Sequence, residues 1–170
     1  MYVTLSAVKE QILLSAILPK LPIVGYLKLT TADLKTIQMI EVVDDEDSEG
    51  WDSYPLFSNS YKDLELYLTA QTQKLDLPLD DSRLTDFQKK VYKVMKSIPY
   101  GKTMTYGEIA QKMNSKAFQA IGTACGKNPF LLTYPCHRVL GTNNLGGFAH
   151  GLEMKQDLLL LEKAISFSCP

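Results

Sequence analysis

Two helix start signals in the second half of the chain constrain its fold more strongly than any other feature of the sequence. Thr85 with Gln88, and Thr105 with Glu108, have the spacing of capping boxes, in which the hydroxyl and the longer polar side chain each bind an otherwise unpaired backbone N–H group. Apolar residues follow the first box at helical spacing as far as Ile98. The sequence therefore predicts a helix from residue 86 to about 98 and a shorter helix from residue 106 through 113.

Two more helices are predicted towards the C-terminus. A turn follows the second helix, and the next helix is expected over residues 116–127, before Pro129. Two short helices joined by a tight turn are typical of a helix-turn-helix, although many small helical bundles contain such a pair. The last helix is expected over residues 153–165.

The first half of the chain has the pattern of a smaller mixed unit. Alternating apolar residues predict strands over residues 23–30 and 36–43, and helical spacing predicts a helix over residues 60–73. Residues 75–81 are expected to form an extended linker that leads into the helical half.

The charges of the chain are distributed unevenly, although its formal net charge is only −1. Residues 1–80 contain 6 basic and 13 acidic residues, whereas residues 81–170 contain 12 basic and 6 acidic residues. This asymmetry fits a polyanion-binding second half and, equally, a chance clustering of charges on solvated faces. With the helix pattern, it predicts an α+β chain of two domains, an N-terminal α/β domain with a short linker over residues 1–80 and a mostly helical C-terminal domain over residues 81–170.

The cysteine count and the apolar segments indicate the cellular compartment in which the protein is expected. Three cysteines, an odd number, argue against a disulfide framework and for a reducing environment. The longest apolar stretches are too short to span a bilayer, and no Lys- or Arg-led apolar segment opens the chain. We therefore expect a cytoplasmic protein, or a nuclear one in a eukaryote, without a membrane partner.

The densest group of reactive side chains consists of Cys136, His137 and Arg138. A cysteine is nucleophilic as its thiolate, which a neighbouring base or cation favours. On an extended segment Cys136 and His137 would point to opposite faces, so a proton relay between them is expected to run through a water molecule. The alternative, favoured for an isolated Cys-His pair, is a structural cysteine beside a core histidine. A zinc site is disfavoured, because the close ligand pairs of structural zinc sites are missing.

Glu162 is the acidic candidate of the C-terminal helix. Leu158, Leu159 and Ile165 are its helical neighbours, so its carboxylate is predicted to be partly buried and to need a partner, for which a histidine is suited. A boundary glutamate that reaches solvent is an equally good reading of the same spacing.

Five short motifs, in this order and spacing, resemble the O6-alkylguanine-DNA alkyltransferase family. They are YGEIA at residues 106–110, KNP at 127–129, PCHRV at 135–139, GGF at 146–148 and GL at 151–152, ahead of the helix that carries Lys155 and Glu162. The similarity covers about residues 84–164, and the first half is similar only in its general pattern. It implies an RNase H-like N-terminal sheet domain and a winged helix-turn-helix in the C-terminal domain.

The resemblance also implies a chemistry, which is one irreversible transfer of an alkyl group from O6 of guanine in DNA to Cys136. Glu162 and His137 match the family's relay, which reaches the cysteine through a water molecule. Tyr106 matches the residue that donates a proton to the departing guanine. The family uses no cofactor for this step, and the metal ligands found in some front domains are missing, since no Cys or His precedes Cys125.

Other residues match the family's positioning and binding groups. Asn128 and Arg138 would hold the cysteine segment in place. The implied substrate pocket comprises Cys125, Val139, Phe148, Ala149 and His150, with the Val139 carbonyl accepting from the guanine amino group. The implied minor-groove helix contributes Lys116, Ala117, Gln119, Ala120, Gly122, Thr123 and Lys127. Because the alkylated base cannot be reached inside a duplex, it must be flipped out. The implied partner is therefore double-stranded DNA that contains O6-alkylguanine, bound by a monomer.

Four positions depart from the family pattern, two of them being Phe148 where tyrosine is common and Ala149 where serine is common. Gln119 stands where the family usually has an arginine that replaces the flipped base, so we expect weaker binding or slower flipping. His150 is expected to narrow the pocket mouth against bulky adducts. Because of Gln119, an alternative function stays open, that of a non-catalytic, alkyltransferase-like protein that marks lesions for other pathways. Such proteins lack the cysteine, however. A plain helix-turn-helix regulator would leave the Cys136 segment and Glu162 unexplained.

Overall fold

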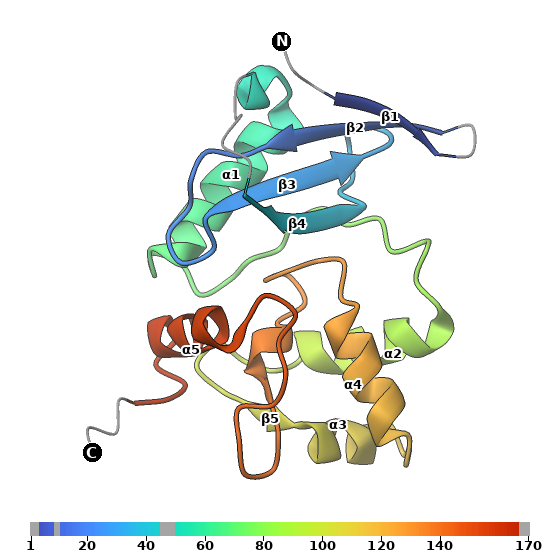
Figure 1. Cartoon of the computed structure of the whole chain (residues 1–170), viewed down its shortest axis with the longest axis vertical. Helices are drawn as coiled ribbons and strands as arrows, with labels where there is room; N and C mark the ends of the chain where they lie inside the picture. The colour runs from blue at the N-terminus through green and yellow to red at the C-terminus, as the bar shows by residue number, and fades with distance from the viewer. Residues whose placement is uncertain (1–3, 9–10, 45–49, 167–170) are drawn as a thin grey trace. The chain divides into compact units, whose positions relative to one another are not determined.

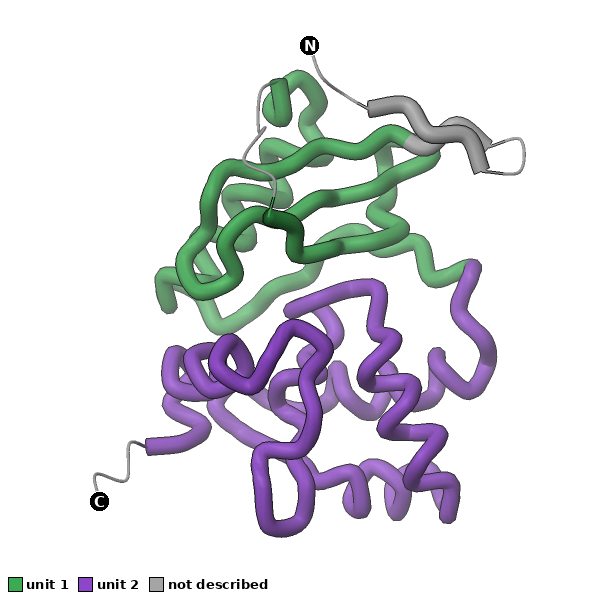
Figure 2. Tube along the Cα trace, in the orientation of Figure 1, with its two compact units in different colours: residues 1–82 green, residues 83–170 purple. Residues whose placement is uncertain are grey.

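The computed structural model describes residues 4–8, 11–44 and 50–166. The chain divides into two compact units, residues 1–82 and 83–170 (Figure 2). A small antiparallel sheet and several helices make up the chain, so the predicted α+β class is confirmed (Figure 1). No helix within the described residues is long and apolar enough to cross a membrane.

Unit 1 is built on a four-stranded antiparallel sheet with the strand order β1-β2-β3-β4. The strands are β1 (Thr4–Val8), β2 (Gln11–Ile17), β3 (Tyr26–Thr31) and β4 (Met39–Val43). In β3, Leu27, Leu29 and Thr31 are buried while the alternate residues are partly exposed, so the period of two places one face in the core. The two predicted strands are confirmed as β3 and β4, with shorter bounds, whereas β1 and β2 were not predicted.

Turns and a bridge explain why β3 and β4 are shorter than predicted. Leu21 pairs with Gly25, whose φ of 71° closes a turn just before β3. Ile37 pairs outside the sheet: its N–H donates to the Pro78 carbonyl at 2.7 Å, and the Asp80 N–H donates to the Ile37 carbonyl at 2.8 Å. The segment predicted as a linker is therefore extended, and it is also bonded to unit 1.

Helix α1 (Pro55–Leu68) follows a short 3-10 turn, η1 (Trp51–Ser53), and lies along one face of the sheet (Figure 1). The helix was predicted over residues 60–73 but starts five residues earlier, because a proline suits the first helical position. It ends before Ala70, which has a left-handed φ of 56°. Phe57 and Leu64 on its inner face are fully buried.

Unit 2 is mostly helical, and both predicted capping boxes are confirmed. Its elements are α2 (Asp86–Lys96), β5 (Met104–Thr105), α3 (Tyr106–Lys112), α4 (Phe118–Gly126), the 3-10 turn η2 (Cys136–Arg138), β6 (Val139–Leu140) and α5 (Leu152–Leu161). The Gln88 N–H donates to Thr85 Oγ1 at 3.2 Å, and the Glu108 N–H donates to Thr105 Oγ1 at the same distance. In both boxes the longer side chain in turn accepts a hydrogen bond from the backbone N–H of the threonine.

Three sequence-based expectations for unit 2 need correction. Helix α4 begins at Phe118, two residues later than predicted. Helix α5 ends at Leu161, and Glu162 is its C-cap, because Lys163 has a left-handed φ of 55°. The Cys136 segment is a 3-10 turn and not an extended strand. Its side chains therefore do not alternate between two opposite faces, as was predicted for Cys136 and His137.

A short parallel pairing fixes the start of α3 beside the Cys136 turn. Met104 pairs with Val139 and Thr105 pairs with Leu140. Behind this pairing, α2, α3 and α4 pack on one another around a buried apolar core that includes Met95. The core thus brings Tyr106 at the start of α3, the inner face of α4 and the η2 turn into one region of unit 2.

Candidate functional site

A cavity of about 270 Å³ in unit 2 marks the candidate site. Its lining residues are Tyr106, Gly122, Cys125, Gly126, Cys136, Gly147, Phe148 and Ala149. They come from the start of α3, the inner face of α4, the η2 turn and the loop that precedes α5. Five of them, Tyr106, Cys125, Cys136, Phe148 and Ala149, are among the residues predicted for catalysis or for the pocket.

Cys136 contributes a thiol to this cavity from the η2 turn, and its side chain is held by Asn128. Asn128 Nδ2 lies 3.4 Å from Cys136 Sγ and donates to the Tyr134 carbonyl at 2.7 Å. The Asn128 Oδ1 accepts from the Phe130 N–H at 3.1 Å. Burial raises the pKa of the Cys136 thiol, although the Asn128 amide and the Lys155 charge oppose this rise. The resting group is therefore a thiol that needs a base to become nucleophilic.

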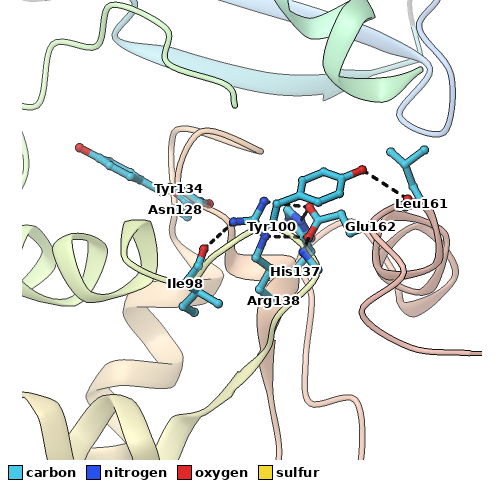
Figure 3. Close-up of polar contacts among 9 residues, drawn as sticks. Ile98, Tyr100, Asn128, Tyr134, His137, Arg138, Leu161 and Glu162 are labelled. Carbon is cyan, nitrogen blue, oxygen red and sulfur yellow. Dashed lines mark hydrogen bonds and ion pairs between the residues drawn. The ribbon is translucent and has the colours of Figure 1, made fainter. Parts of the chain in front are cut away.

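His137 follows Cys136 in the same turn, and Glu162 orients its ring (Figure 3). His137 Nε2 lies 2.7 Å from Glu162 Oε1, and both side chains are fully buried. Since an ionised carboxylate only accepts, Nε2 carries the proton and Nδ1 is the free basic nitrogen. Burial, together with the charges of Arg138 and Lys155, lowers the pKa of His137 although the Glu162 carboxylate opposes this, which favours a neutral ring. His137 Nδ1 has no hydrogen-bond partner among the described protein groups.

Glu162 is held by more partners than the sequence predicts. Arg138 Nε donates to Glu162 Oε2 at 2.8 Å, and Arg138 Nη2 donates to Oε1 at 3.0 Å. Arg138 Nη1 in turn donates to the Ile98 carbonyl at 2.6 Å (Figure 3). Gly101 donates its N–H to Oε2 at 3.3 Å, and an added Cβ at Gly101 would come within 2.8 Å of the Glu162 backbone oxygen. The buried carboxylate therefore ties three segments of unit 2 together.

Lys155 is a site residue that the sequence argument missed. Its side chain is fully buried, and its Nζ donates to the Val139 carbonyl at 2.6 Å and to the Gly147 carbonyl at 3.1 Å. Burial lowers the pKa of Lys155 to about 8. The signal was present, because Lys155 shares a helical face with Leu158 and Glu162, and the reasoning that predicted a buried Glu162 applies equally to it.

The Lys155 contact changes the expectation for Val139. The Val139 side chain is fully buried and is not among the lining residues, and its carbonyl oxygen is already bonded to Lys155. A guanine amino group bound at that oxygen would share it with Lys155.

Tyr106 reaches the cavity from the first turn of α3. Burial raises the pKa of its phenol, although a hydrogen bond with the Gly147 backbone opposes the rise. The ring lies so close to Gly146 that an added Cβ there would be 3.0 Å from Tyr106 Cε2. Gly146 also has a φ of 68°, which favours glycine.

The remaining predicted residues occupy the rim and the outer surface. His150 does not line the cavity, but its ring centroid lies 5.6 Å from that of Phe148. Burial raises the pKa of the Cys125 thiol to about 12, and its Sγ lies 3.5 Å from Met95 Sδ. The exposed residues of the predicted DNA-binding set are Lys116, Ala117, Gln119, Ala120, Thr123 and Lys127. In the described part of the chain, no three His, Cys, Asp or Glu side chains gather as metal ligands, and Cys169 lies outside that part.

A buried cysteine that faces a small cavity, beside a neutral histidine held by a buried carboxylate, is the arrangement of a protein that acts through a cysteine nucleophile. Comparison with known proteins narrows this class. Residues 86–164 match the family described as 6-O-methylguanine DNA methyltransferase, DNA binding domain. The methylated-DNA–protein-cysteine methyltransferase of Mycolicibacterium paratuberculosis is 36% identical over 145 residues, which are 82% of this chain and 87% of that protein. The chain belongs to this methyltransferase family.

Other relatives agree with this assignment. The methylated-DNA–protein-cysteine methyltransferase of Methanosarcina acetivorans is 44% identical over 108 residues, covering 62% of this chain and 69% of that protein. Among solved structures, Mycobacterium tuberculosis OGT in complex with DNA is similar with a TM-score of 0.75 and 32% identity, over 88% of this chain and 92% of that chain.

Proposed function

We propose that this chain repairs DNA by transferring the alkyl group of O6-alkylguanine, typically a methyl group, to Cys136, once per molecule. The observation that carries the proposal is the position of Cys136 in a cavity of about 270 Å³, next to a neutral His137 bonded to Glu162 at 2.7 Å. Family membership supports the same activity, since the relatives are named methylated-DNA–protein-cysteine methyltransferases.

The transfer begins with activation of the thiol. The Cys136 proton passes to His137 Nδ1 through a water molecule, while Nε2 keeps its bond to Glu162. The thiolate attacks the alkyl carbon, an S–C bond forms as the C–O6 bond breaks, and the bonding electron pair stays on the guanine. Burial favours this relay, because a histidine with a lowered pKa is neutral and can accept the proton.

Tyr106 completes the step by donating its phenolic proton to the departing guanine, which would otherwise leave as an anion. Tyr106 supports this role by its place in the cavity lining and by its phenolic proton, which burial retains at neutral pH because it raises the pKa of the phenol. The products are guanine and an S-alkylated Cys136, and the protons balance when the protonated His137 releases its proton to solvent and the Tyr106 phenolate takes one up. The S–C bond of that thioether is not broken again to restore the thiol, so each molecule reacts once.

The second unit is proposed to bind the duplex. Helices α3 and α4 would act as a helix-turn-helix with β5 and β6 as its wing, and α4 would lie in the minor groove while the damaged base is flipped into the cavity. The charge of this region supports the proposal, because residues 109–152 contain no Asp or Glu. For unit 1, an RNase H-like arrangement is proposed on the strength of its antiparallel strands followed by one helix.

The test is covalent label transfer. The protein is incubated with a duplex that carries O6-methylguanine labelled in its methyl group, and protein-bound label is measured. The wild type is expected to take up one label per molecule, Cys136→Ala none, and the control Cys125→Ala close to the wild-type amount. Label on the Cys136→Ala variant would refute the mechanism. Tight lesion binding by the wild type without transfer would instead support the non-catalytic, lesion-flagging alternative.

A further inference from the structure

The outer end of α4 carries an exposed aromatic ring. Phe118, the first residue of the helix, is 53% exposed. Only three large apolar side chains in the described part of the chain are exposed, and the other two, Met39 and Leu152, lie on other elements. A single exposed apolar residue is common on protein surfaces, so the position of Phe118 relative to the cavity decides what it can do.

Phe118 lies on the same face of α4 as the residues that line the cavity. Gly122, Cys125 and Gly126 follow it at i+4, i+7 and i+8, and all three contribute to the lining. An added Cβ at Gly122 or Gly126 would have no described atom within 4 Å. The helix therefore presents bare backbone from the ring of Phe118 to the cavity that holds Cys136, over about 6 Å of axial rise to Gly122 and about 12 Å to Gly126.

The surroundings of this face favour a nucleic acid as its partner. From residue 109 to residue 152 the chain has no Asp or Glu, and Lys112, Lys116 and Lys127 are exposed there. A polyanion that lies on α4 would have these cations beside its phosphates and the apolar ring of Phe118 facing its bases.

We propose that Phe118 is the residue that enters the base stack at the lesion, so that its ring fills the space of the extruded base. The bare face at Gly122 and Gly126 gives the extruded nucleotide a path to Cys136. Proteins that bind the minor groove commonly insert apolar side chains between base steps, and a phenyl ring stacks on any base. Gln119 has a similar position, at i+3 from Gly122 and i+7 from Gly126, and neither it nor Phe118 lines the cavity. Only Phe118 has a ring that can stack on bases. This inference rests on the proposed function.

Single-turnover transfer rates test the inference with two substrates. One is O6-methylguanine in a duplex, and the other is O6-methylguanine as the free base, which has no stack to leave. Phe118→Ala is expected to slow transfer from the duplex at least tenfold and to leave transfer from the free base within twofold. Phe118→Tyr should retain most of the duplex rate, and Gln119→Ala should lose less of it than Phe118→Ala.

The outcomes separate this inference from the proposed function. A wild type that takes no label from either substrate overturns the proposed function. If the wild type reacts, three results overturn only the role of Phe118. They are a duplex rate of Phe118→Ala within twofold of the wild-type rate, an equal loss of rate on both substrates, and a larger loss of duplex rate for Gln119→Ala than for Phe118→Ala.

A spectroscopic measurement reports the insertion directly. The chain has one tryptophan, so Trp51→Phe combined with Phe118→Trp leaves a single indole at position 118. Its fluorescence is expected to be quenched on binding a lesion duplex, because an inserted indole stacks on bases, whereas an indole introduced by Gln119→Trp should be quenched less. Equal or absent quenching at position 118 would contradict the insertion.

Discussion

At the scale of single residues, the candidate site depends on two buried charged side chains, Lys155 within α5 and Glu162 at its C-cap. Glu162 accepts from His137, Arg138 and the Gly101 backbone, while Lys155 donates to two backbone carbonyls. Burial of a charge is costly unless each of its hydrogen-bonding groups is satisfied. The pairing of both residues therefore holds the η2 turn and the loop before α5 around the cavity.

Replacing Lys155 by methionine should reveal the cost of burying this charge. The variant leaves the Val139 and Gly147 carbonyls without their donor, a loss of about 1–3 kcal/mol. Because burial lowers the pKa of Lys155 to about 8 from 10.5, the folded protein binds fewer protons than the unfolded chain between these values. The free energy of unfolding of the wild type should therefore rise relative to that of Lys155→Met as the pH increases from about 8 to about 10.5.

Urea unfolding at a series of pH values measures this difference, with the exposed Lys102→Met as the control. Parallel stability curves for the wild type and Lys155→Met across the whole window would mean that Lys155 is not desolvated in solution.

At the scale of elements, the loop between β6 and α5 lines one side of the cavity through Gly147, and Gly146 sets the turn just before it. Gly146 has a φ of 68° and lies against both Tyr106 and the Gly141 backbone. Its N–H donates to Asn144 Oδ1 at 2.8 Å, which closes the turn. A side chain at this position would be strained by the backbone conformation and would push against Tyr106.

Gly146→Ala should destabilise the protein by about 1–3 kcal/mol, the typical cost of a strained backbone conformation, and should slow methyl transfer by displacing the Tyr106 ring. The stability control is Gly107→Ala, which lies within α3 and should raise the free energy of unfolding by about 0.5–1 kcal/mol, because alanine is the better helix former. Urea unfolding and single-turnover transfer are measured for both variants. A Gly146→Ala protein as stable and as fast as the wild type would show that this contact does not constrain Tyr106.

At the scale of the whole molecule, the net charge of −1 conceals an acidic first half and a basic second half. The acid-free stretch from residue 109 to residue 152 contains α4 and the η2 turn, so the residues proposed to face DNA lie where phosphates are not repelled. Binding through phosphate contacts releases counterions and weakens as the salt concentration rises.

Affinity for a lesion duplex should therefore fall steeply as salt rises from 50 to 200 mM. For a protein that makes about six to ten phosphate contacts, the affinity falls by a factor of about 10³–10⁵ over this range. Lys116→Gln and Lys127→Gln should each lower the slope of log K against log salt by about 1. Lys74→Gln, an exposed change in unit 1, serves as the control and should leave the slope unchanged. Fluorescence anisotropy of a labelled duplex measures all four proteins, and slopes that stay equal would exclude Lys116 and Lys127 from phosphate contact.

The sequence by itself determined the features that depend on neighbours within a few residues. The capping boxes at Thr85 and Thr105 specified where α2 and α3 begin, because the bonding groups lie three residues apart. The apolar spacing around Glu162 indicated its burial, and the Cys136 motif indicated the reactive group.

Only the tertiary structure decided which groups those residues meet. Strands β1 and β2 escaped prediction because a strand is stabilised by its partners across the sheet, not by its own neighbours. The Lys155 bond to Val139, and the meeting of α4 with the Cys136 turn at the cavity, depend on contacts between segments distant along the chain. Residue spacing cannot supply such contacts, since they form only when several elements pack around one core.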